Sequence, residues 1–401
     1  MTDTMRLQAN WLRDPAVGRV IAALESARPG CARFVGGCVR NTIMQRPIDD
    51  IDIAVQLPPQ ATIDALEAAE IRAVPTGFDH GTITAVADGE AFEVTSLRRD
   101  VETDGRRAVV AFTEDWREDA QRRDFRLNAL YLAPDGELFD PVGGGFEDAK
   151  AGRVVFIGDA DERLREDYLR LLRFFRFNAW YGAEMDAEGL AACTRQAEGL
   201  RKIARERIWK ELRKLLEALD PGEALDAMAE TGALSIILPD AADGHRLHDL
   251  RVSEQLVGAA PDALLRLMAL LPRNTQAASR VCEALRLANR DAARLEAWAR
   301  DDAPPLAGLT GPVLRAALYN LGPQTMADHA MLSGRDVRDI MAAIRVWRRP
   351  EFPITGDDAL QAGLSGPQIG IALRRAEQAW VASDFTLDRN ALLDLLVEDQ
   401  D

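Results

Sequence analysis

The stretch FVGGCVRNTIMQRPIDDIDIAV, residues 34–55, decides how the first part of this chain folds. An apolar run ends in Gly36 and Gly37, and acidic residues then interrupt a second apolar run. Residues two apart in a strand project to the same side, so Asp50 and Asp52 should face together while the isoleucines enter the core. Like charges this close are unfavourable unless a cation lies between them. The stretch therefore predicts paired carboxylates that hold a metal ion.

The type of ligand indicates which metal. Oxygen ligands suit Mg²⁺, and paired carboxylates that hold metal over a phosphate are typical of nucleotidyl transfer with two metal ions. We therefore expect Mg²⁺ on Asp50 and Asp52, with Glu93 of the strand-like FEVTSL as a third carboxylate from a neighbouring strand. Taken alone, Asp-x-Asp is also consistent with an exposed edge strand whose acids are simply solvated.

The glycine pair strengthens the metal interpretation. A strand that ends in Gly36 and Gly37 and opens a helix leaves backbone N–H groups free to approach a triphosphate, and Arg40 adds positive charge one turn later. A simple helix-start turn would use the same residues. Strand, glycine pair, arginine and Asp-x-Asp in this order predict a phosphate site beside the metal site.

Composition limits the possible partners. The 401 residues carry a formal net charge of -16, which argues against a protein that coats nucleic acid through bulk charge, so any such contact should be local. The four cysteines have neither paired zinc spacing nor the density of a disulfide framework. The first residues lack a signal-peptide pattern and no apolar stretch approaches membrane-spanning length, so we expect a cytoplasmic protein.

Strand and helix signals divide the chain. Short β-rich runs alternate with helical patterns up to residue 157, which predicts an α/β or α+β domain, whereas periodic Leu, Ala and Arg segments follow to the end. We expect a head over 1–157, a helical neck over 158–220 and a helical body and tail over 221–401. The expected helices are 11–27 and 61–70, and the expected strands are 32–35, 50–55, 82–86, 92–97, 108–112 and 129–133.

The segment RRDFRLNALYL, residues 122–132, carries further candidates for nucleotide binding. Arg123 could pair with a phosphate, and Asp124 or Asn128 could hydrogen-bond ribose hydroxyls. An ordinary arginine-rich helix end is the alternative.

A second candidate lies in DADERLREDYLRLLRFFRFNAWYG, residues 159–182. We expect one helix on which Asp167, Arg170, Arg173 and Arg176 share a face at steps of three residues. A carboxylate accepts from an exocyclic amine and a guanidinium donates to a ring nitrogen, so an Asp and Arg pair would select cytosine and adenine together. Taken alone, such a face is also typical of a salt-bridged surface.

A local basic patch follows. Between residues 195 and 214, eight basic residues face three acids. The patch could hold the phosphates of an RNA stem, although a helix stabilised by ion pairs has the same pattern. The expected RNA-binding residues are Arg201, Lys202, Arg205, Arg207, Lys210 and Lys214.

Taken together, these motifs resemble the class II nucleotidyltransferases, the family of tRNA CCA-adding enzymes and bacterial poly(A) polymerases. The resemblance covers residues 33–216 and rests on motifs in the family's order: VGGCVRN, DDIDIAV, PTGFDHGTITAV, EVTSLRRDVETDGR, RRDFRLNALYL, DPVGGGFEDAKAGRVVFIGD, RLREDYLRLLRFFRF and RERIWKELRKLL. It implies an α+β fold, with a polymerase-beta-like head that contains a mixed sheet and an all-α neck, body and tail.

The resemblance also implies roles. Asp50 and Asp52 would bind magnesium, and Gly37 and Arg40 would lie at the triphosphate. Residues 123–128 fall in the ribose motif, residues 167–176 in the protein template for the base and the arginines after it, and residues 140–148 in the hinge between head and neck. Two positions depart from the pattern: Asn41 replaces a frequent Asp, and Arg126 replaces the usual Thr.

The expected activity is therefore the addition of C, C and A to the 3' end of tRNA from CTP and ATP. An enzyme that adds only A, a poly(A) polymerase and a non-catalytic RNA-binding protein are the alternatives. A nucleotidyltransferase that modifies a small molecule is a further alternative, against which the long helical tail and the Asp and Arg pair argue. The TG-x-x-HGT turn at residues 76–82 favours the CCA-adding branch. The segment HRLHD, residues 245–249, faintly suggests a histidine-aspartate phosphohydrolase module, which needs further ordered ligands.

Overall fold

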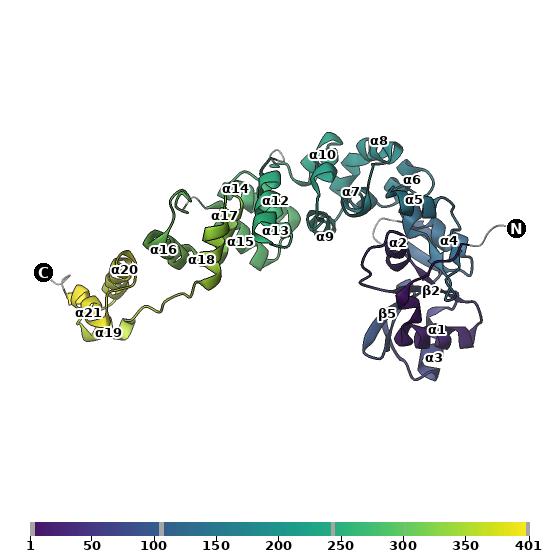
Figure 1. Cartoon of the computed structure of the whole chain (residues 1–401), viewed down its shortest axis with the longest axis horizontal. Helices are drawn as coiled ribbons and strands as arrows, with labels where there is room; N and C mark the ends of the chain where they lie inside the picture. Colours follow the sequence, from purple (N-terminus) through teal and green to yellow (C-terminus); the bar gives the residue numbers. More distant parts are fainter. Residues whose placement is uncertain (1–4, 104–107, 242–244, 301, 398–401) are drawn as a thin grey trace. The chain divides into compact units, whose positions relative to one another are not determined.

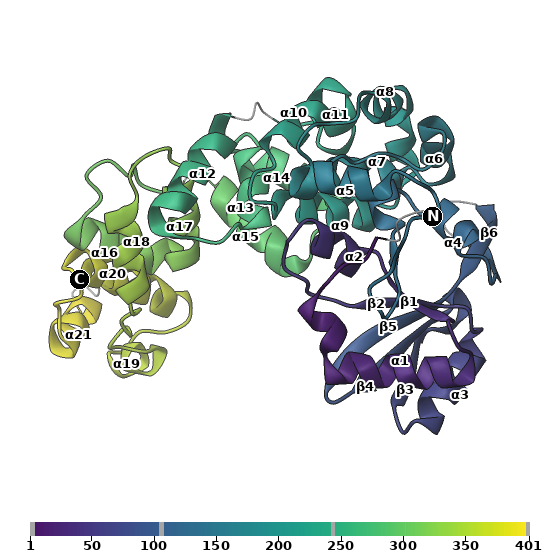
Figure 2. The same ribbon diagram turned by 45° about the vertical axis from the view of Figure 1, so that its right-hand side comes forward.

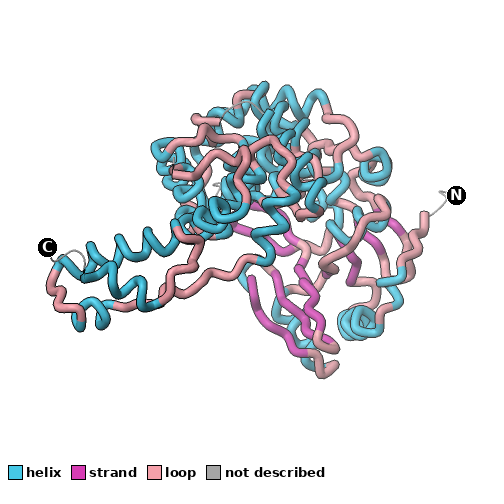
Figure 3. The backbone as a smooth tube through the Cα atoms, turned by 60° about the vertical axis from the view of Figure 1, so that its left-hand side comes forward, coloured by secondary structure: helices cyan, strands magenta, loops and turns pink. Residues whose placement is uncertain are grey.

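Strands occupy only the first part of the chain that the structure describes, as the magenta segments of Figure 3 show. The structure, a computed structural model, describes residues 5–103, 108–241, 245–300 and 302–397. The chain divides into two compact units, Met1–Pro239 and Asp240–Asp401. The first unit contains every described strand, and the described part of the second is helical (Figure 1). The predicted boundaries at 157 and 220 stay predictions.

The sheet of the first unit is mixed, which confirms the predicted α+β class. Strands β2 and β5 pair in parallel, and the other neighbours in the sheet are antiparallel. A separate hairpin joins β6 (Arg98–Thr103) to β7 (Ala108–Phe112). The strand order is β3 (Arg72–Gly77), β4 (Thr82–Ala87), β5 (Glu90–Ser96), β2 (Asp52–Val55), β1 (Ala32–Val35), β8 (Tyr131–Leu132) and β9 (Leu138–Phe139).

Two helices, α1 (Pro15–Ala27) and α3 (Pro59–Ala68), pack against each other and against the sheet (Figure 2). The predicted helix over 11–27 begins later than expected, because Asp14 caps α1 and Pro15 occupies its first turn, while Asn10–Arg13 form the 3-10 helix η1. The apolar face of α1, with Val17, Val20, Ile21 and Leu24, is buried.

The strand that carries the acids crosses the middle of the sheet. Ile53, Ala54 and Val55 of β2 are all buried, since the strand has neighbours on both sides and is covered on both faces. The strand begins at Asp52, so Asp50 precedes it, and the expected strand over 50–55 is two residues too long. The expected strand over 129–133 is reduced to Tyr131–Leu132.

The rest of the first unit is helical. A cluster of phenylalanines, in which the Phe156 and Phe174 rings stack at 5.4 Å, joins the end of the head to α7. The elements are η2 (Phe78–His80), α2 (Gly37–Ile43), α4 (Trp116–Gln121), η3 (Arg126–Asn128), α5 (Gly145–Ala151), α6 (Ala160–Glu166), α7 (Leu169–Tyr181), α8 (Ala187–Gln196), η4 (Ala197–Lys202), α9 (Arg205–Leu216), α10 (Gly222–Glu230) and α11 (Ala233–Ile237).

The second unit contains two apolar clusters, one that includes Trp380 and one that includes Leu318, both formed by residues from 306 onward. No helix of the described residues is long and apolar enough to cross a membrane. The helices are α12 (His245–Val257), α13 (Ala263–Ala269), α14 (Thr275–Leu285), α15 (Asn289–Ala299), α16 (Gly311–Leu321), α17 (Pro323–Met331), α18 (Arg338–Val346), α19 (Gly356–Gln361), α20 (Pro367–Ala382) and α21 (Arg389–Val397).

Candidate active site

The glycine turn after β1 lies against the acidic strand. Gly36 precedes α2 with φ 75° and ψ -124°, a conformation that favours glycine. A Cβ atom at this position would lie 3.8 Å from Asp52 Oδ2 and 3.8 Å from Arg123 Nη1. Gly36, Asp52 and Arg123, three residues predicted from separate motifs, therefore meet at one place in the structure.

Asp52 lies beside two further carboxylates. The parallel pairing of β2 with β5 places Glu93 directly opposite Asp52. Burial, together with the charges of Glu93 and Asp50, raises the pKa of Asp52 to about 6, while Arg123 opposes this rise. Asp50 and Glu93 are both exposed. Asp52 is therefore a half-buried acid whose nearest charged neighbours include two other acids.

The chemistry of these donors fits a hard divalent cation, because repulsion among carboxylates is what such a cation relieves. The side chains do not, however, converge into a closed cage. Among the described residues, no group of three or more His, Cys, Asp or Glu side chains is arranged to hold a metal ion. This also holds for His245, His248 and Asp249, so the faint phosphohydrolase pattern gains no support.

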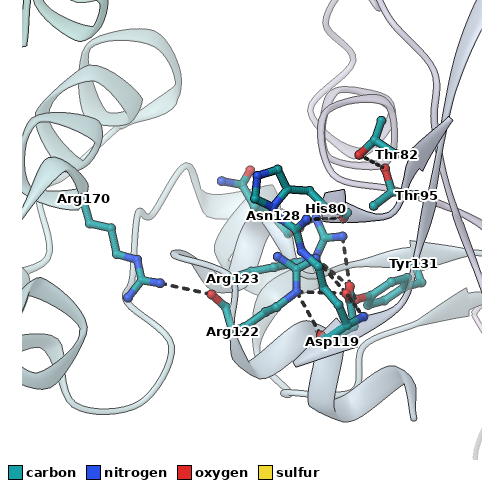
Figure 4. Close-up of polar contacts among 10 residues, drawn as sticks. His80, Thr82, Thr95, Asp119, Arg122, Arg123, Asn128, Tyr131 and Arg170 are labelled. Carbon is teal, nitrogen blue, oxygen red and sulfur yellow. Dashed lines mark hydrogen bonds and ion pairs between the residues drawn. The ribbon is translucent and has the colours of Figure 1, made fainter. Parts of the chain in front are cut away.

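Arg123 is held by an acid that sequence reasoning missed. Asp119, which is 1% exposed, accepts hydrogen bonds from Arg123 Nη2 at 3.1 Å, Arg122 Nη2 at 2.7 Å and the Tyr131 hydroxyl at 2.6 Å (Figure 4). Burial acts to raise the pKa of Asp119, but the charges of Arg123 and Arg122 and the hydroxyl of Tyr131 lower it well below its ordinary value. Asp119 therefore fixes the guanidinium that faces Asp52.

Local sequence explains this arrangement. Asp115 caps α4, and Asp119 lies on that helix three and four residues before Arg122 and Arg123. Helical spacing of this kind brings oppositely charged side chains together. The spacing was available in the sequence and is the signal that could have identified Asp119.

A chain of hydrogen bonds joins the other ribose candidates to α2 and α7. Arg40 Nη1 donates to Asn128 Oδ1 at 2.7 Å, and Asn128 Nδ2 donates to Asp124 Oδ1 at 3.1 Å. Arg173 Nε donates to Asp124 Oδ2 at 2.7 Å. Burial acts to raise the pKa of Asp124, but Arg173 and Asn128 hold it below its ordinary value. These hydrogen bonds link α2 to α7 through Asn128 and Asp124.

Arg40 lies deeper than expected for a residue that touches a triphosphate. It is 6% exposed, its Nε and Nη2 donate to Asn41 Oδ1, and its guanidinium lies 3.9 Å from the centre of the Tyr181 ring. Asn41, the residue that departs from the family pattern, thus supplies an acceptor without a negative charge. Burial lowers the pKa of Arg40 accordingly.

The other departure from the pattern, Arg126, lies against the glycine-rich segment. Its Nη1 approaches Asp148 Oδ2 at 3.8 Å, and a Cβ atom on Gly144 would lie 3.3 Å from that Nη1. Asp140 accepts hydrogen bonds from the backbone of Gly143 and Gly145. The predicted hinge role of residues 140–148 stays a prediction.

The expected single helix over the base-reading residues is wrong. Asp167 ends α6, and its Oδ1 caps the next helix by accepting from Leu169 N at 3.0 Å. Its Oδ2 accepts from Arg207 Nη2 at 2.7 Å. Because Asp167 has extended dihedral angles, φ -151° and ψ 103°, it is not on one helical face with Arg170.

The three arginines of α7 each have an acidic partner. Arg170 Nη1 pairs with Glu166 at 2.5 Å, and its Nη2 donates to the Arg122 carbonyl at 3.2 Å (Figure 4). Arg173 pairs with Asp124, as described above, and Arg176 pairs with Glu211 of α9 at 2.7 Å. Without a bound nucleotide, the arginines of this face therefore form ion pairs, as in the salt-bridged alternative.

The basic patch lies on η4 and α9. Arg201 pairs with Glu198 at 2.7 Å, the Lys202 ammonium lies 5.3 Å from the centre of the Tyr168 ring, and Arg207 is half-buried against Asp167. The exposed members of the patch are Arg201, Lys202, Arg205, Lys210 and Lys214.

Comparison with known proteins gives two family matches, the second of which begins in the first unit and ends in the second. Residues 32–155 match the family described as the Poly A polymerase head domain, and residues 182–244 match the family described as the probable RNA and SrmB- binding site of polymerase A.

Two relatives extend over most of the chain. This chain is 33% identical to the mitochondrial CCA tRNA nucleotidyltransferase 1 of Danio rerio, over 91% of this chain and 86% of that protein. It is 34% identical to the CCA-adding enzyme of Levilactobacillus brevis over 90% and 92%. The crystal structure of the Bacillus stearothermophilus CCA-adding enzyme in complex with CTP superimposes with a TM-score of 0.79, at 25% identity over 96% of this chain and 98% of that one.

Proposed function

Since the chain belongs to the family of CCA tRNA nucleotidyltransferases, or CCA-adding enzymes, we propose that it adds C, C and A to the 3' end of tRNA from CTP and ATP and releases pyrophosphate. The observation that carries the proposal is the meeting of Gly36, Asp52 and Arg123 in a chain similar to these enzymes over nine tenths of its length. A nucleotidyltransferase needs such an arrangement, because it brings the triphosphate of its substrate to the acid that binds the metal.

The acids have the first role. Asp50 and Asp52 would hold Mg²⁺, and Glu93 would support them from β5. When bound, the metal supplies activation of the 3' hydroxyl and neutralises the leaving pyrophosphate. Asp52 is suited to metal binding because its half-buried carboxylate faces other acids and is stabilised by few cations in the protein itself.

Arg123 and the glycine turn would hold the triphosphate. Arg123 is fixed by Asp119, so it loses little conformational entropy when a phosphate binds. The absence of a side chain at Gly36 leaves a gap between Arg123 and Asp52 that a phosphate oxygen can approach. Asp124 and Asn128 would contact the ribose, although Arg173 and Arg40 already hold them in the protein without substrate.

Base selection would require an exchange of partners. Asp167 Oδ2 accepts from Arg207, so an exocyclic amine of cytosine or adenine would replace that guanidinium. Arg170, which Glu166 and the Arg122 carbonyl hold close by, would donate to the ring nitrogen. Arg207 would then be released toward the exposed basic patch, whose cations would meet the phosphates of the tRNA.

The test uses purified full-length protein with magnesium and three tRNA transcripts that end before CCA, after C and after CC. CTP alone, ATP alone or both are offered, and product lengths are read on a gel. Addition of two C residues followed by one A is the expected result. Addition of A only to the CC-ending transcript would identify an A-adding enzyme, and long A tails would identify a poly(A) polymerase.

Matched variants separate catalysis from binding. Asp52→Asn should abolish incorporation while tRNA still binds, and Asp64→Asn, an acid of α3 that accepts from Gln60, should leave incorporation unchanged. Full incorporation by Asp52→Asn would contradict the assignment of the metal site. Binding without incorporation by the wild type would favour the RNA-binding alternative.

A further inference from the structure

The residue that follows Asp167 packs into a neighbouring element. Tyr168 directly precedes α7, and Gly199 is buried on η4, the 3-10 helix just before α9. A Cβ atom on Gly199 would lie 2.0 Å from Tyr168 Cδ1, 2.1 Å from Cε1 and 2.5 Å from Cγ. Atoms without a bond between them do not approach this closely, so the tyrosine ring occupies the space that only a glycine leaves.

The helix η4 is firmly packed at this point. Ala197 and Leu200, on either side of Gly199, are buried, and η4 contacts α7, α8 and α11. At the end of η4, the Lys202 ammonium lies 5.3 Å from the centre of the Tyr168 ring. Because η4 is held by three helices and the ring can rotate, a side chain at residue 199 would displace the ring.

Two contacts hold the carboxylate of Asp167, and a third holds the backbone beside it. Asp167 Oδ1 accepts from Leu169 N at 3.0 Å, and Oδ2 accepts from Arg207 Nη2 at 2.7 Å. The third contact is the packing of the Tyr168 ring against Gly199, which uses neither oxygen. This contact therefore does not compete with a ligand of the carboxylate.

The packing of Tyr168 becomes more important when a base is bound. In the proposed function, an exocyclic amine of cytosine or adenine replaces Arg207 at Asp167 Oδ2, and the ion pair with α9 is lost. The ring of Tyr168 still links this segment to η4.

Rejection of the other two bases requires a rigid carboxylate. Uracil and guanine carry a carbonyl oxygen where cytosine and adenine carry the amine, so two acceptors would face each other. This repulsion is large only if the carboxylate cannot turn away, because rotation would relieve it. A loosely held Asp167 would therefore accept the wrong bases more readily.

We propose that Tyr168 and Gly199 are positioning residues that set the base specificity, because the ring packed against Gly199 keeps Asp167 rigid while it reads the base. The proposal rests on the proposed function, in which Asp167 accepts from the base. Tyr168 and Gly199 act through Asp167 and need no contact with the nucleotide.

The test is calorimetric titration of the full-length protein with CTP and with UTP, in the presence of Mg²⁺ and without tRNA. The wild type should bind CTP more tightly than UTP. Gly199→Ala should lower the ratio of the UTP Kd to the CTP Kd about tenfold or more, because Asp167 can then turn away from the uracil carbonyl. Tyr168→Ala should lower the ratio similarly, and it adds no atom, so the test does not depend on the folding of Gly199→Ala.

Three further variants separate positioning from stability. Gly136→Ala, in the head, would place a Cβ atom 2.5 Å from the Leu7 carbonyl oxygen, so it should destabilise the protein without changing the ratio. Tyr168→Phe keeps the ring and should keep the ratio. Gly199→Ala combined with Tyr168→Ala should lower the ratio no further than Tyr168→Ala alone, because both changes remove the same contact.

The proposal would be overturned by equal binding of CTP and UTP to the wild type, or by an unchanged ratio in Tyr168→Ala or in folded Gly199→Ala. An equal fall of the ratio in Gly136→Ala would also overturn it, since the effect would then follow from lost stability. Selective binding of CTP without incorporation into tRNA would contradict the proposed CCA addition and support the positioning role, so the two proposals fail separately.

Discussion

Asp52 and Asp119 are both acids of the head next to Arg123, but they have opposite electrostatic environments. Asp52 faces Glu93 and Asp50, and its pKa is raised to about 6, with burial as the largest cause. Asp119 is almost fully buried, but it accepts from two arginines and a tyrosine, and its pKa is well below the ordinary value. Burial alone therefore does not decide the charge state of an acid here, since its hydrogen-bond partners do.

The different partners of Asp52 and Asp119 indicate which acid serves the reaction and which one stabilises the fold. A carboxylate that lacks cationic partners destabilises the folded protein, and it is retained where a ligand supplies the missing charge. A carboxylate with every lone pair satisfied by donors stabilises the fold and orients those donors. We infer that Asp52 acts on the substrate and that Asp119 acts through Arg123, which makes Asp119 a positioning residue.

The largest expected effect is on catalysis at Asp52. Asp52→Asn should reduce incorporation by about 10³-fold or more, because metal-assisted charge neutralisation is worth several kcal/mol in the transition state. Single-turnover incorporation into a CC-ending transcript measures this. Glu93→Gln should have a smaller effect, and Glu90→Gln on the same strand, which is the control, should have none. Equal losses in all three would show a structural effect on β5 and β2.

The next effect is on folding at Asp119. Asp119→Ala should lower the free energy of unfolding by about 3–5 kcal/mol, because it leaves Arg122 and Arg123 without their buried partner. Urea unfolding followed by circular dichroism measures the change. Glu114→Ala, which breaks the exposed pair with Arg28, is the control and should change the free energy of unfolding much less. Similar losses in the two variants would contradict the claim that the buried partners of Asp119 stabilise the fold more than an exposed ion pair does.

The pH dependence of the free energy of unfolding should also report on the acids that have cationic partners. The pKa values of Asp119 and Asp124 are lower in the folded protein than in the unfolded chain, so their stabilisation is present above about pH 4 and is lost as the pH falls further. The free energy of unfolding should therefore decline in the wild type as the pH falls below about 4. Asp119→Asn should show a shallower decline, and an identical slope would contradict the assigned partners.

The smallest expected effect concerns the pair formed by Asp167 and Arg207. Both side chains are partly exposed, so Arg207→Gln should change the KM for CTP by only about two- to fivefold, toward tighter binding, because a competitor for Asp167 is removed. Arg213→Gln, which breaks an exposed pair on the same helix, is the control. A higher KM in Arg207→Gln alone would mean that Arg207 itself contacts the nucleotide.

Much of this arrangement could be predicted from local sequence. The turn at Gly36 lies where the glycine pair places it, and the acidic strand lies within the expected 50–55 but begins only at Asp52. The helical second half follows from the change of period after residue 158, whereas the mixed sheet was expected only from the resemblance to the class II nucleotidyltransferases. The register that places Glu93 opposite Asp52 depends on which strands pair, and no local pattern specifies that.

The base-reading segment was harder to predict because a cap overrides its helical pattern. Asp167 accepts from Leu169 N, and a new helix starts there although the sequence around it reads as one continuous helix. Tyr168 packs against Gly199, where a Cβ atom would lie 2.0 Å from the ring. These two residues are 31 positions apart in the sequence. Their contact holds the break between α6 and α7 in place, and the residue pattern of a single helix gives no sign of such a contact.

The central claim is that a metal ion supplies positive charge to Asp52 beyond that of Arg123. Thermal unfolding of the wild type and Asp52→Asn with and without MgCl₂ tests it most directly. Without divalent metal, Asp52→Asn should have the higher Tm, because the repulsion from Glu93 and Asp50 is removed. Added Mg²⁺ should raise the Tm of the wild type and close this gap. A lower Tm for Asp52→Asn without metal, and no response of the wild type to Mg²⁺, would contradict the account.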